Sequence, residues 1–99
     1  MLSINKETDN KNLTIALSGR LDTTTAPDLE KEVKENTDGL ESLIFDCTSL
    51  EYISSAGLRV LLSAQKIMNK QGSMVVKNAS DEVKEIFEVT GFSDILTIE

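Results

Sequence analysis

A buried strand, a helix and a second buried strand follow one another in the second half of the chain, and this order constrains the fold most. Leu43-Ile44-Phe45 and Met74-Val75-Val76 are short apolar runs, typical of strands buried on both faces. Between them, a helical pattern begins after Ser54-Ser55 and stops at Gln71-Gly72. This strand, helix and strand order predicts a right-handed crossover between two parallel strands.

The rest of the chain predicts the remaining elements of one α/β domain. Apolar and polar residues alternate over 2–5 and 13–18, which indicates an opening β-hairpin. A threonine, a proline and an acidic residue at 25–28 favour the start of a helix expected to run to about Asn36. Ser80 can cap a third helix that Gly91 ends. The apolar residues of the C-terminal segment suffice for a last short strand or helical turn.

These elements predict a mixed β-sheet of roughly four to five strands, with helices packed mainly on one face. The hairpin supplies the antiparallel pair and the crossover units supply the parallel pairs. With 99 residues and no linker, we expect a single domain over residues 1–99.

The composition argues against several classes of function. A net charge of −7 opposes binding to nucleic acid and to anionic membranes, and no apolar run is long enough for membrane insertion. The absence of histidine removes the usual general base and the commonest zinc ligand. Cys47, the single cysteine, is interpreted as a small buried hydrophobe. With no export signal, we expect a cytoplasmic protein.

The polar face of the central helix consists of Arg59, Ser63, Lys66 and Lys70, spaced three or four residues apart. A charged line opposite an apolar face is usually the solvated side of a helix, and a docking stripe is the alternative.

Two serines and a glycine stand where the buried strand passes into this helix. Either Ser54 or Ser55 could cap the helix, which is worth about 1 kcal/mol. Gly57 costs about 1 kcal/mol of helix stability relative to alanine, so it indicates a steric need. That need is either close approach of a partner or tight packing within the chain.

The stretch Leu50-Glu51-Tyr52-Ile53-Ser54-Ser55-Ala56-Gly57-Leu58-Arg59-Val60-Leu61 resembles the signature of STAS domains, specifically the small bacterial anti-sigma factor antagonists. In that family a partner kinase phosphorylates the serine two residues before the glycine, which is Ser55 here, with Ser54 as the backup acceptor. Many members carry an acidic residue before that serine and a serine or threonine after it, whereas this chain has Ser54 and Ala56.

A second segment, Gly19-Arg20-Leu21-Asp22, resembles the family's glycine, any residue, leucine, aspartate pattern, whose aspartate lies near the phosphorylated serine. Asp22 is that residue here. Its alternative role is that of a loop carboxylate bonded to the hydroxyls or amides of residues 23–25.

The resemblance implies a STAS-type fold and partner switching. The unphosphorylated form would bind an anti-sigma factor with kinase activity and release a sigma factor, as in stress or sporulation signalling. Phosphorylation of Ser55 would switch it off, and a serine phosphatase of the protein phosphatase 2C type would reverse this. The residues implied in partner binding are Asp22, Ser54, Ser55, Ala56, Gly57, Leu58 and Arg59.

The resemblance also implies that the chain is no enzyme and holds no catalytic residue, metal or cofactor, because ATP and divalent metal belong to its partners. A related alternative is a STAS partner-switching subunit that regulates secretion, biofilm formation or another signalling assembly. An enzyme with Ser55 as nucleophile is disfavoured, since the sequence contains no histidine to activate it.

Overall fold

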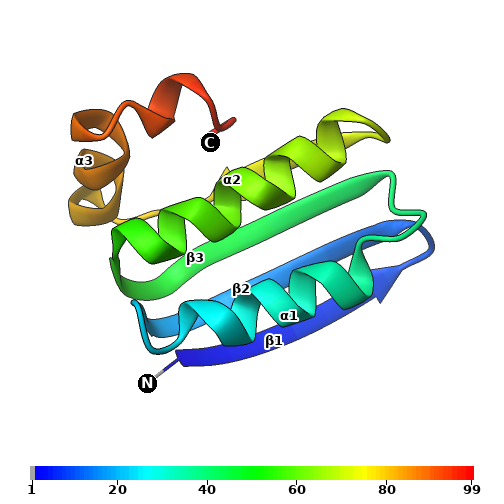
Figure 1. Cartoon of the computed structure of the whole chain (residues 1–99), viewed down its shortest axis with the longest axis horizontal. Helices are drawn as coiled ribbons and strands as arrows, with labels where there is room; N and C mark the ends of the chain where they lie inside the picture. Colours follow the sequence, from blue (N-terminus) through cyan, green and yellow to red (C-terminus); the bar gives the residue numbers. More distant parts are fainter. Residues whose placement is uncertain (1) are drawn as a thin grey trace.

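The computed structural model describes residues 2–99 and contains one sheet with the strand order β1-β2-β3-β4 (Figure 1). β1 (Leu2–Asp9) and β2 (Asn12–Leu21) form an antiparallel hairpin. β3 (Ser42–Ile53) pairs in parallel with β2 on one side and with β4 (Ser73–Lys77) on the other. The predicted hairpin, parallel crossover and mixed sheet are therefore confirmed.

Helices connect the parallel strands. α1 (Ala26–Asn36) joins β2 to β3, and α2 (Ser55–Asn69) joins β3 to β4. α3 (Asp81–Val89) follows β4 and leads into the short 3-10 turn η1 (Phe92–Asp94). Figure 1 shows α1 and α2 side by side over the same face of the sheet.

Capping at the two outer helices follows the sequence only in part. The Ser80 hydroxyl accepts the backbone N–H of Val83 at 3.2 Å, which confirms the predicted cap of α3. Thr25 occupies the capping position of α1 but makes no side-chain capping bond, and Pro27 lies in the first turn as expected. Gly91 follows α3 with a φ of 80°, a conformation that glycine adopts without strain.

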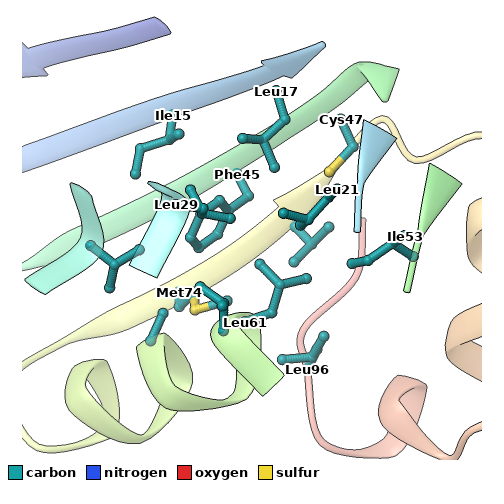
Figure 2. Packing of buried hydrophobic residues seen from close by; sticks show 14 of the residues in the cluster. Ile15, Leu17, Leu21, Leu29, Phe45, Cys47, Ile53, Leu61, Met74 and Leu96 are labelled. Atoms are coloured by element: carbon teal, nitrogen blue, oxygen red, sulfur yellow. The ribbon is translucent and has the colours of Figure 1, made fainter. Parts of the chain in front are cut away.

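The core fills the space between the sheet and the helices. Alternate residues of the strands point into it from one face of the sheet, and Figure 2 shows how they meet side chains of the helices. The strand residues include Ile15, Leu17, Phe45, Cys47 and Met74, and the helix residues include Leu29 and Leu61. Burial raises the pKa of the Cys47 thiol to about 12, which fits a small hydrophobe and no redox role.

The opposite face of the sheet is less covered than the sequence predicts. Ile44 and Val75 point to that face and are only half-buried. The prediction that the two apolar strands are buried on both faces is wrong, because α1 and α2 pack on the same side.

The C-terminal segment closes the outer edge of β4. Leu96 is buried, and the backbone N–H of Val76 donates to the carbonyl of Thr97 at 2.8 Å. Val76 also forms a parallel bridge with Ile98. Both a helical turn and a short strand-like end are therefore present. Among residues 2–99, no helix is long and apolar enough to cross a membrane.

Candidate functional site

The predicted site lies at the corner where β2 and β3 end and α2 begins. Leu21 and Ile53, the last residues of the two strands, are register partners. The backbone N–H of Ser54 donates to the carbonyl of Leu21 at 2.8 Å. The end of β2 therefore fixes the start of α2 and brings Asp22, the next residue after Leu21, to the same corner.

The two serines of this corner have different structural roles. Ser54 is the capping residue of α2, and its side-chain oxygen accepts the N–H of Gly57 at 3.4 Å. Its carbonyl accepts the N–H of Leu58 at 2.9 Å. Ser55 is the first helical residue, is exposed, and its hydroxyl makes no hydrogen bond to any residue from 2 to 99. Ser54 therefore provides the cap, and the Ser55 hydroxyl is left accessible.

Asp22 organises the loop that follows β2. Its Oδ1 accepts the hydroxyl of Thr24 at 2.7 Å and the backbone N–H groups of Thr24 and Thr25 at 3.0 and 3.2 Å. The bond from the Thr24 hydroxyl is the main reason why the pKa of the Asp22 carboxyl lies below its ordinary value. The loop-carboxylate role of Asp22 is therefore confirmed, and the side chain is ionised at neutral pH.

Gly57 and Leu58 require a correction, because both face the core rather than a partner. A Cβ atom on Gly57 would lie 2.6 Å from Cγ of Leu21 and 2.9 Å from Cγ1 of Ile53. Leu21 and Ile53 are labelled in the core view of Figure 2. Leu58 is only 2% exposed. The packing alternative therefore explains Gly57, and the accessible part of the predicted contact set is Asp22, Ser54, Ser55, Ala56 and Arg59.

Comparison with known proteins assigns the chain to a family. The STAS domain model matches residues 3–99. The chain belongs to the STAS domain family.

The relatives of this STAS domain include an anti-sigma-B factor antagonist of Listeria monocytogenes, 35% identical over 97 residues that cover 95% of this chain and 84% of that protein. An anti-sigma factor antagonist from Mycobacterium paratuberculosis has the same fold, with a TM-score of 0.89 at 21% identity over 99% of this chain and 85% of that one. The Bacillus protein SpoIIAA in its phosphorylated form superposes with a TM-score of 0.77 at 16% identity, covering 98% of this chain and 91% of that one.

A cation–π contact that sequence reasoning missed lies at the same corner of the STAS domain. Arg20 and Tyr52 are register partners at the ends of β2 and β3, and the guanidinium carbon lies 4.5 Å from the ring centroid. Nε of Arg20 is also 3.9 Å from Oδ2 of Asp22. Arg20 and Tyr52 each belong to one of the two segments that resemble the family. Parallel pairing of these two strand ends is the signal from which their contact could have been predicted.

A groove between α1 and α2 adjoins the two serines. It has a volume of about 290 Å³ and is lined from the α1 side and from the first turns of α2, by Thr23, Ala26, Pro27, Glu30, Ala56, Arg59, Val60 and Ser63. Ala56 and Arg59 thus belong to both the predicted contact set and the groove. Within the described chain no three metal-ligating side chains lie together as a metal site requires. The corner is therefore a surface that carries the exposed Ser55 hydroxyl beside a groove.

Proposed function

We propose that this STAS domain is an anti-sigma factor antagonist controlled by phosphorylation of Ser55. In this proposal the unphosphorylated form binds, in the cytoplasm, an anti-sigma factor with serine kinase activity and so releases a sigma factor. The observation that carries the proposal is the division of roles between Ser54, which caps α2, and Ser55, whose hydroxyl is accessible. The name of the Listeria relative supports the assignment to anti-sigma factor antagonism.

The position of Ser55 suits a phosphate. A phosphate at the first helical residue meets backbone N–H groups that have no partner within the helix, together with the positive end of the helix dipole. Ser54 already occupies the N–H of Gly57, so modification of Ser55 leaves the existing cap in place. SpoIIAA, whose fold the chain shares, is described in a phosphorylated form, so this fold accommodates the modification.

In this proposal the chain is a substrate and a binding module, with no catalytic group of its own. The kinase transfers the γ-phosphoryl group of ATP to the Ser55 hydroxyl, the hydroxyl proton is lost and ADP leaves. A protein phosphatase 2C-type enzyme hydrolyses the phosphoserine and restores the binding form. ATP and the divalent metal are held by these partners.

Mass spectrometry tests the site of modification. With the cognate kinase and ATP, we expect one added phosphate, located at Ser55 by fragment spectra. Ser55→Ala should remain unmodified. Ser54→Ala is the matched control and should still be modified at Ser55, although loss of its cap costs about 1 kcal/mol of stability. Full modification of Ser55→Ala, at Ser54 or elsewhere, would show that the site is wrongly assigned.

A further inference from the structure

We propose that Arg59 holds the phosphate of phosphorylated Ser55 within the chain itself, as an ion pair across one turn of α2. This inference rests on the proposed function and deepens it, because it names the residue that receives the charge of the modification. Ser55 and Arg59 are four residues apart on α2, and both are exposed. Residues at this spacing lie one above the other on the same face of a helix.

The order and direction of the two side chains favour this contact. A helical side chain leans toward the N-terminus of its helix, so an arginine at 59 covers the turn that begins at Ser55. Arg59 and Ala56 line the same groove, which places the arginine beside this turn. An acidic group four residues before a basic one is the more favourable order for an ion pair in a helix. A guanidinium can also bind two phosphate oxygens at once.

Arg59 is available for this role in the unmodified protein. It forms no ion pair with any residue from 2 to 99. The acidic residue on the other wall of the groove, Glu30, is paired with Lys34, with 3.1 Å between Oε1 and Nζ. The Ser55 hydroxyl has no hydrogen-bond partner in this part of the chain either. The new pair therefore breaks no ion pair or hydrogen bond of these two side chains.

Arg20, the other of the two arginines in the chain, is the competing candidate. Its guanidinium carbon lies 4.5 Å from the ring centroid of Tyr52, and its Nε lies 3.9 Å from Oδ2 of Asp22. A phosphate that recruited Arg20 would have to compete with these contacts and would be repelled by the Asp22 carboxylate. Arg59 has no such contacts to give up, so we assign the phosphate to Arg59.

The ion pair explains why the modification needs no rearrangement of the domain. Phosphorylation adds a charge of about −1.5 to −2, and the counterion for this charge comes from the same helix. The start of α2 gains negative charge and loses an unpaired positive group in one step. An exposed pair of this kind stabilises a helix only slightly, so the domain should melt as the unmodified protein does.

The second pKa of the phosphate tests the pair, because a neighbouring cation favours the doubly charged form. Phosphoserine is incorporated at position 55 during synthesis of the full chain, so the test needs no kinase. Titration followed by phosphorus NMR should give a pKa that is about 0.3 to 0.5 lower in the protein with Arg59 than in Arg59→Gln. The difference should shrink at high salt. Arg59→Lys keeps the charge and should recover part of it.

Two control variants each remove one positive charge elsewhere. Lys66→Gln changes the same helix about 16 Å further along its axis than Ser55, which is beyond the screening length. Arg20→Gln removes the competing arginine. Both variants should keep the phosphate pKa within about 0.1 of its value in the unsubstituted phosphoprotein. The Nε–H signal of Arg59, and not that of Arg20, should move as the phosphate titrates.

The possible results separate this inference from the proposed function. A phosphate pKa that Arg59→Gln leaves unchanged within about 0.1 would overturn the pair. An equal rise in Lys66→Gln would reduce the effect to net charge, and a rise confined to Arg20→Gln would assign the phosphate to Arg20; either result also overturns the pair. If the pair is found but the cognate kinase does not modify Ser55, the proposed function fails and the ion pair stands.

Discussion

Phosphorylation of Ser55 is expected to weaken binding to the anti-sigma factor by at least about a hundredfold without unfolding the domain. Burial of an unpaired charge at an interface costs several kcal/mol, and each 1.4 kcal/mol corresponds to about a factor of ten in affinity. The phosphate places such a charge at an exposed residue of the predicted contact set, beside the groove between α1 and α2. Calorimetry with the phosphorylated and unmodified proteins measures the difference directly.

Substitutions at Ser55 separate the effect of charge from the loss of the hydroxyl. Ser55→Ala should bind the partner about as well as the unmodified protein, because Ser54 and not Ser55 caps α2. Ser55→Asp and Ser55→Glu should bind much more weakly, although their single charge mimics a phosphate only in part. If all these forms bound with the same affinity, a switch at Ser55 would be excluded.

Gly57→Arg is expected to destabilise the fold by about 3 kcal/mol or more, which is at or above the upper end of typical overpacking costs. The first atom of any side chain would collide with Leu21 and Ile53, which are 0% and 1% exposed and cannot move aside freely. An arginine would in addition bring a charge into an apolar space. Gly57→Ala should lose less, since alanine recovers about 1 kcal/mol of helix propensity. Urea unfolding curves measure both variants.

Ala56→Arg is the matched control for this prediction. Ala56 is the preceding residue, is only half-buried and lines the groove between α1 and α2. The Ala56→Arg variant should therefore fold nearly as well as wild type and lose partner binding. A Gly57→Arg protein that melted like wild type and still lost binding would return Gly57 to the partner-contact role that the family resemblance implied.

Most of the fold could be predicted because its signals are local. The alternation of the hairpin, the serine cap of α3 and the glycine after it each depend on neighbouring residues. The length of β3 could not be predicted in this way. The apolar run Leu43-Ile44-Phe45 predicts only a short strand, but β3 continues through polar residues to Ile53, because irregular parallel pairing with β2 sustains it. Asp46 lies mid-strand opposite Lys77.

The site shows the same division between local and tertiary information. Resemblance to the family located the corner, and the structure then separated Ser54 from Ser55, which residue type alone could not do. Gly57 was misinterpreted because the side chain nearest to an added Cβ belongs to Leu21, in a distant part of the sequence. The groove was missed for the same reason, since it exists only where α1 and α2 lie side by side.

Phosphorylation of Ser55 is expected to act through local charge and not through refolding, and amide chemical shifts of the two forms distinguish these possibilities residue by residue. We predict that the shifts change around Asp22, residues 54–58 and their immediate neighbours, while the sheet and α3 stay almost unchanged. The start of α2 is held by a backbone bond to Leu21 and by the Ser54 cap, neither of which the phosphate disturbs. Changes spread over the whole domain, or an altered melting transition, would contradict a local charge switch.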